Sequence, residues 1–116
     1  MEEDKIKALA KDIARVFNLS MRRILKLEEE KRKVVSEMER VFTKYNLWKE
    51  AQGKVEGREG VLKGLAGHTL EVLKEEIVRL ERRVRKIEEE ERDIRLRFRF
   101  EVEKLIRKHL LPPIEG

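Results

Sequence analysis

The sequence predicts an all-α protein, built as a long antiparallel two-helix coiled-coil hairpin. The chain has 116 residues, of which 46% are charged and 5% aromatic, a composition typical of long helices and coiled coils. Apolar residues recur in steps of three and four in both halves of the chain. Five of the six glycines lie in one central segment that separates these halves. We expect one domain over residues 1–116.

The first helix is predicted from about residue 3 to residue 52. Its apolar series keeps helical spacing throughout and comprises Ile6, Ala10, Ile13, Phe17, Ser20, Ile24, Leu27, Lys31, Val34, Met38, Val41, Tyr45, Trp48 and Gln52. The triplet Asn18-Leu19-Ser20 resembles a helix break, but the spacing passes through it unchanged. A single helix is therefore favoured over the alternative in which residues 3–17 fold back as a third helix.

Residues 53–68 are expected to form a glycine-rich turn, because glycine is the residue that interrupts helices most readily after proline. The segment ends in Gly67-His68-Thr69, and Thr69 suits the N-cap of the next helix. This ending is similar to a phosphate-binding loop. However, Leu62 stands where the first glycine of that motif belongs, and His68 replaces its lysine. We therefore interpret the segment as a turn.

The second helix is predicted from about residue 69 to residue 110, followed by a short tail over residues 111–116. The stretch DIRLRFRFEV, residues 93–102, alternates apolar and charged residues as a half-buried strand does. The helical series nevertheless continues through it, and comprises Leu70, Leu73, Ile77, Leu80, Val84, Ile87, Glu91, Ile94, Phe98, Glu101 beside Val102, Leu105 and His109. A strand in this stretch would interrupt the spacing by three and four residues. We therefore predict a helix that ends before Pro112 and Pro113.

Antiparallel pairing of the two series predicts the register of the hairpin. Tyr45 is placed beside Ile77, and the polar residue Lys31 falls opposite Glu91. Such a pair is expected to select the register more than to add stability, because desolvation offsets much of the attraction. We interpret the Lys31 and Glu91 pair as structural, with a catalytic pair as the less favoured alternative.

Apolar residues outside the two series have no place in a two-helix core. They include Leu9, Val16, Leu25, Val35, Phe42, Val72, Val78, Leu96, Phe100, Ile106 and Leu110. The expected interface consists of Leu25, Val35, Phe42, Leu96, Phe100 and Ile106. We predict a homo-oligomer, with a dimer favoured, in which self-association completes a four-helix bundle. A helix of another protein is the alternative occupant of this surface.

A group of basic residues from both helices is the candidate nucleic-acid site. The predicted register brings seven of them to one level, and we call this set the basic collar: Arg22, Arg23, Lys26, Arg92, Arg95, Arg97 and Arg99. In a chain of net charge +5, such a group suits contacts with phosphates that do not read base sequence. The competing interpretation is a salt-bridged surface of a thermophilic protein, which the scarcity of Asn and Gln favours.

Residue types that carry chemistry indicate no site. The chain has no cysteine, which excludes thiolate metal sites and a cysteine nucleophile. His68 and His109 are expected at opposite ends of the hairpin and so cannot share a metal, and His109 is expected to serve packing or the helix dipole. The run from Glu88 to Glu91 is interpreted as a solvated face. We therefore predict no catalytic residue, metal, cofactor or small-molecule substrate, and a protein that is not an enzyme.

No apolar run approaches the length of a membrane span, and the start MEEDKIKALA is acidic where a signal peptide is basic and then apolar. We expect a cytoplasmic protein.

The layout resembles that of the prefoldin β-subunit family in its length, its two long helices and the ending Leu110-Leu111-Pro112-Pro113. The resemblance implies a holdase chaperone that uses exposed apolar helix tips. That family carries a β-hairpin between its helices, whereas residues 53–67 here hold many glycines and no β-branched alternation. The favoured function is a non-enzymatic protein-interaction or scaffold protein. The alternatives are a nucleic-acid-binding accessory protein and a prefoldin-like holdase.

Overall fold

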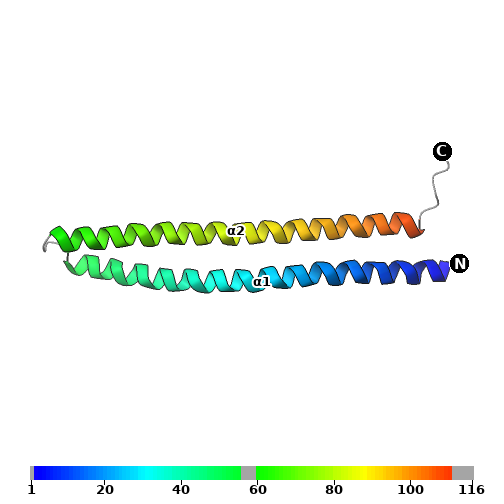
Figure 1. Ribbon diagram of the computed structural model, residues 1–116, viewed down its shortest axis with the longest axis horizontal. Coiled ribbons are helices and arrows are strands. Elements are labelled where there is room, and N and C mark those ends of the chain that lie inside the picture. The colour runs from blue at the N-terminus through cyan, green and yellow to red at the C-terminus, as the bar shows by residue number, and fades with distance from the viewer. Residues whose placement is uncertain (1, 56–59, 111–116) are drawn as a thin grey trace, which may run out of the picture. The chain divides into compact units, whose positions relative to one another are not determined.

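The computed structural model describes residues 2–55 and 60–110, and the side chains of residues 2–54 and 64–110. Two helices account for these residues: α1 spans Glu2–Val55 and α2 spans Gly60–Leu110 (Figure 1). The all-α hairpin is confirmed, and α1 runs through Asn18-Leu19-Ser20 as one helix. The stretch DIRLRFRFEV is also helical, within α2. Acidic residues occupy the first turn of α1 and basic residues the last turn of α2, where each sign suits the helix dipole.

The prediction of a turn over residues 53–68 is wrong for most of its length, since α1 continues to Val55 and α2 begins at Gly60. Thr69 is not an N-cap. It lies inside α2, where its Oγ1 donates a hydrogen bond to the carbonyl of Leu65 at 2.9 Å. A glycine inside a helix costs about 1 kcal/mol relative to alanine. Burial of Ala66 and Leu70 offsets this cost, so the helix extends through Gly64 and Gly67.

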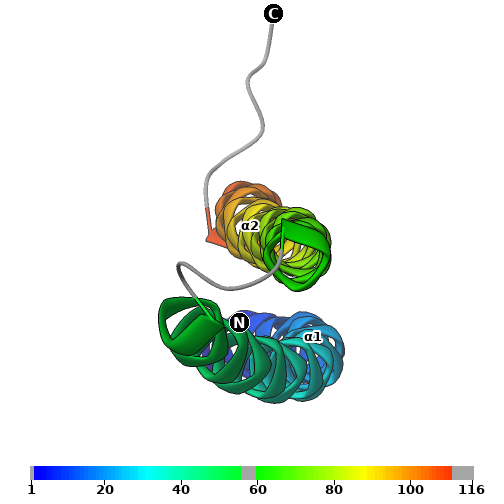
Figure 2. The ribbon, with the colours of Figure 1, turned by 90° about the vertical axis from the view of Figure 1, so that its left-hand side faces the viewer.

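The chain divides into two compact units, each of which contains a part of α1 antiparallel to a part of α2. Unit 1 comprises Met1–Glu28 and Glu88–Gly116, and unit 2 comprises Glu29–Ile87. Figure 2 shows α1 and α2 end-on, and no other described element covers their outward sides. Each unit therefore has a core between two helices and helix faces that meet solvent.

The core of unit 2 follows the predicted series closely. Its buried side chains are Val34, Val41, Ala66, Leu70, Leu73, Ile77, Leu80 and Ile87. Among them Leu80 and Val34 are the largest that are fully buried. A Cβ atom added at Gly67 would lie 4.0 Å from Gln52 Nε2, which places this part of α2 beside the end of α1. Trp48, in contrast, belongs to the predicted apolar series of the first helix but is exposed.

The core of unit 1 differs from the prediction near the start of α1. Leu9 was expected to be exposed but is buried, and Val16 is partly buried, whereas Ile6 is 57% exposed and Phe17 is also exposed. A helix turns once in 3.6 residues, so a series of 3.5-residue spacing drifts by about 20° per heptad around a straight helix. This drift changes which positions of α1 face α2 within unit 1. Residues next to those of the predicted series are then the ones that become buried. The seam farther along α1 is where predicted, with Ile24 buried.

Candidate interaction surfaces

The basic collar is divided between different sides of unit 1. One groove of about 380 Å³ is lined by Arg23, Lys26, Leu27, Glu90, Asp93, Ile94 and Arg97. Its three basic and two acidic side chains leave a net charge of +1, and the carboxylates of Glu90 and Asp93 would repel a phosphate. The groove therefore holds only three of the seven predicted basic residues.

Three other arginines of the collar share a different side of α2. Arg92, Arg95 and Arg99 are spaced by three and four residues, so they lie on one face, and all are exposed. Arg97 is two residues from Arg95 and from Arg99, which places it about 200° around the helix from both. Arg22 is also exposed, on α1. The structure thus does not bring the seven residues into one surface, and their binding to nucleic acid stays a prediction.

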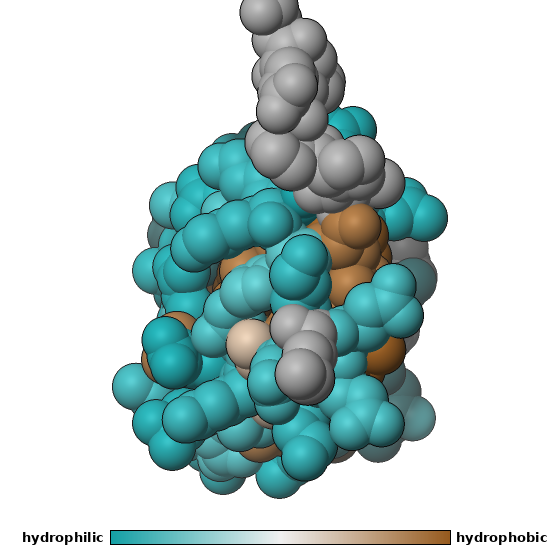
Figure 3. Space-filling view, turned by 90° about the vertical axis from the view of Figure 1, so that its right-hand side faces the viewer, coloured by the Kyte–Doolittle hydropathy of each residue, from teal (hydrophilic) through white to brown (hydrophobic). Residues whose placement is uncertain are grey.

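The six apolar residues expected at an interface are all exposed, in agreement with their position outside the core. Leu25, Leu96, Phe100 and Ile106 belong to unit 1, and Val35 and Phe42 belong to unit 2. Leu96 is 54% exposed and Phe100 is 65% exposed. Figure 3 views the end at which α1 begins and α2 ends, where hydrophobic surface shows between the hydrophilic side chains. The role of the six apolar residues as an interface stays a prediction.

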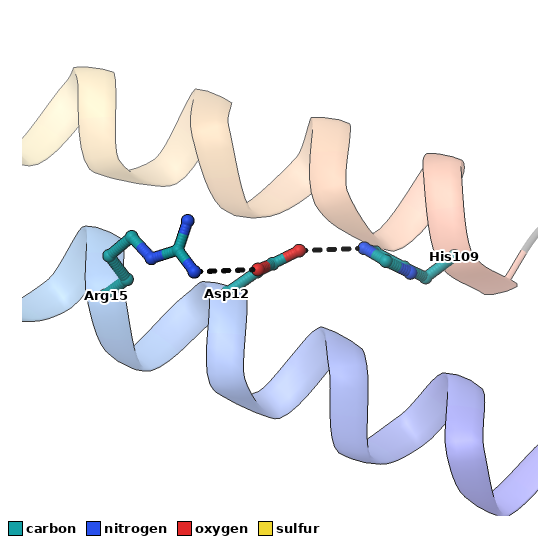
Figure 4. A network of polar contacts seen from close by, with 3 residues as sticks. All are labelled: Asp12, Arg15 and His109. Atoms are coloured by element: carbon teal, nitrogen blue, oxygen red, sulfur yellow. Dashed lines mark hydrogen bonds and ion pairs between the residues drawn. The ribbon is translucent and has the colours of Figure 1, made fainter.

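A polar contact joins the two helices near this end of unit 1 (Figure 4). His109 Nε2 lies 3.0 Å from Asp12 Oδ2, and Arg15 Nη2 lies 3.9 Å from Asp12 Oδ1. From the sequence, His109 was expected to serve packing or the helix dipole, and Asp12 was missed as its partner. The predicted register indicates this pair, because antiparallel pairing places residues near 12 and 109 at the same level. This arrangement is a polar contact between the two helices of unit 1.

Replacing His109 with alanine is expected to lower the free energy of unfolding by about 1 kcal/mol, because a partly buried hydrogen bond between the helices is lost. Urea denaturation followed by circular dichroism measures the change. His68→Ala is the matched control, since His68 is exposed on α2. Equal effects of the two substitutions would contradict a stabilising role for the Asp12 and His109 contact.

An aromatic contact within unit 1 also joins the helices. The rings of Phe17 and Phe98 meet edge to face, with centroids 5.8 Å apart and planes at 65°. Such a pair contributes about 0.5–1.5 kcal/mol beyond the area it buries. The contact keeps Phe17 at the edge of the core even though its side chain is exposed.

Glu91 is the buried charged residue of the described core, with an exposed fraction of 8%. Its Oε1 has no hydrogen-bond partner among the described residues. Lys31, its predicted partner, is partly exposed. The Lys31 and Glu91 pair stays a prediction, while the burial of Glu91 in the seam is as expected.

Ion pairs on the helix surfaces join an acid to a base three residues later in the same helix. They are Asp12 with Arg15, Glu29 with Arg32, Glu71 with Lys74, Glu76 with Arg79, and Glu101 with Lys104. Exposed pairs of this kind contribute about 0.3–0.5 kcal/mol each. They support helix formation and create no site for chemistry.

Within residues 2–55 and 60–110, no three His, Asp or Glu side chains are placed to hold a metal ion. Neither described helix contains an apolar stretch long enough to cross a membrane. No protein-family model matches this chain, and neither the curated proteins nor the solved structures provide a match. The resemblance to prefoldin β subunits remains one of layout, and its Leu111-Pro112-Pro113 motif lies outside the described residues.

Proposed function

We propose that this chain is a non-enzymatic scaffold protein that associates with a second copy of itself through the outward side of α2. The observation that carries the proposal is the exposure of Leu96, Phe100 and Ile106 on a helix whose opposite side forms the core. Full burial of one such side chain contributes about 1.5–3 kcal/mol. Burial of these side chains on association would therefore add stability that the two helices alone do not provide. Exposed apolar patches also commonly mark interaction sites.

The two alternative functions have less support. A nucleic acid that follows the basic collar would meet the carboxylates of Glu90 and Asp93 in the groove, and the other arginines face elsewhere. A holdase of the prefoldin kind would use apolar helix tips, whereas exposed apolar residues such as Val78 and Leu96 occur well inside α2. Self-association accounts for the exposure of Leu96, Phe100 and Ile106 without either difficulty.

The proposal is tested by the mass of the full chain in solution at several concentrations, measured by light scattering after size-exclusion chromatography. We expect the unmodified chain to be a dimer. The double substitution Leu96→Glu and Phe100→Glu is expected to give a monomer, because it places four charges in the interface of each dimer. Circular dichroism should show unchanged helix content, since both residues are exposed in the hairpin.

The matched control is Val72→Glu with Val78→Glu, which changes two exposed valines of the same helix outside the predicted interface. This variant should remain a dimer. A chain that is monomeric without any substitution would overturn the proposal. So would a dimer that survives Leu96→Glu with Phe100→Glu.

A further inference from the structure

The outward side of α2 between Arg92 and Leu110 repeats the spacing of a coiled-coil seam. Its exposed residues recur in alternate steps of four and three. They are Arg92, Leu96, Arg99, Glu103, Ile106 and Leu110, and we call this set the outer seam. The buried residue Ile94 is two positions from Leu96, about 200° around the helix. Leu96 therefore faces away from the core, and the other residues of the outer seam are exposed on the same helix.

The outer seam is complementary to a second copy of itself that runs in the opposite direction. Leu96 then packs against Ile106 of the second copy, and Arg99 lies opposite Glu103 of the second copy. Arg92 covers Leu110 of the second copy with its aliphatic stem and keeps its charge in water. Because the arrangement is twofold symmetric, each of these contacts occurs twice.

The charges distinguish this arrangement from a parallel one. In parallel alignment Arg99 would meet Arg99 of the second copy, and Glu103 would meet Glu103. Like charges in direct opposition at a seam are destabilising, and proteins use them to exclude unwanted pairings. In the antiparallel alignment, Arg99 of each copy instead meets Glu103 of the other copy, and both contacts are attractive.

Residues beside the outer seam fit the same alignment. In an antiparallel coiled coil, the residues that flank the seam on one side meet their equivalents in the other helix. Phe100 then lies close to Phe100 of the second copy at the twofold axis, where ring pairs add to the energy of burial. Asp93 lies opposite Arg107 of the second copy. Within the described part of the chain, Asp93, Arg99, Glu103 and Arg107 form no ion pair.

We propose that two copies of this chain associate in antiparallel orientation through the outer seam, about a twofold axis beside Phe100. The proposal rests on the proposed function and adds to it the orientation and register of the two copies. It predicts which charge of one copy faces which charge of the other.

Charge exchange in the full chain tests this register, with the dissociation constant of the dimer measured by sedimentation equilibrium. Arg99→Glu places two like-charge contacts in each dimer and is expected to raise the dissociation constant about tenfold or more. Glu103→Arg is expected to do the same. An equimolar mixture of the two variants should regain the original affinity, because the introduced glutamate of one variant then faces the introduced arginine of the other. Arg22→Glu, an equal charge change on exposed α1, should leave the constant unchanged.

A cysteine variant gives a second measurement that does not depend on charge. The natural chain has no cysteine, so Phe100→Cys introduces a single thiol. Beside the twofold axis, two such thiols should form a disulfide when dissolved oxygen is present to accept the two electrons and two protons, while Arg22→Cys should not crosslink.

The proposed register is wrong if the chain dimerises but the mixture of Arg99→Glu and Glu103→Arg shows no recovery, or if Phe100→Cys does not crosslink. The proposed function stands in that case, provided that Leu96→Glu with Phe100→Glu still separates the dimer. A monomeric natural chain would overturn both proposals together.

Discussion

Replacing Leu80 with alanine is expected to lower the free energy of unfolding by about 3 kcal/mol. Leu80 has an exposed fraction of 0% and is one of the two largest fully buried side chains of the described chain. The substitution removes apolar contacts and leaves a cavity, and both terms destabilise the folded state. In a core made of only two helices, few neighbouring side chains are available to fill that cavity.

Urea denaturation followed by circular dichroism at 222 nm measures this effect, with all variants at one protein concentration because association adds to apparent stability. Val78→Ala is the matched control, since Val78 lies two residues away on α2 and is exposed. Its effect should stay within about 0.5 kcal/mol. A Leu80 variant as stable as the Val78 variant would contradict the core of unit 2.

Replacing Glu91 with leucine is expected to raise the free energy of unfolding by about 1–3 kcal/mol. The carboxyl group is buried in the seam between Ile87 and Ile94, and its Oε1 accepts no hydrogen bond from the described residues. A buried polar atom without a partner carries its full desolvation cost. Leucine has a similar volume and continues the apolar seam.

The same denaturation experiment measures this gain, and Glu89→Leu is the control because Glu89 is exposed on α2. The control should change stability little. Glu91→Gln separates charge from shape, since it keeps the size of the side chain and removes its charge. A loss of stability in Glu91→Leu would show that the carboxylate is stabilised by a partner by more than its burial costs.

Local spacing was enough to predict the helices and most of the core. The phase from Leu70 to His109 passes through DIRLRFRFEV, and this continuity distinguished a helix from a strand because a helical period is a property of the chain itself. Buried Val34 and Leu80 were assigned to the core for the same reason. The exposure of Leu96 and Phe100 followed from their position off that series.

The tertiary structure decided which residues at the edge of each apolar face are buried and where α2 begins. Leu9 rather than Ile6 enters the core, because burial depends on how far each helix is rotated toward its partner. The start at Gly60 depends on packing of Ala66 and Leu70, which outweighs the weak helix propensity of glycine. The rotation of the two helices also brings Asp12 into contact with His109. It divides the basic collar between different sides of unit 1. The sequence by itself determined the helical period and the charges it carries, whereas rotation and packing of two helices decided which of these side chains meet.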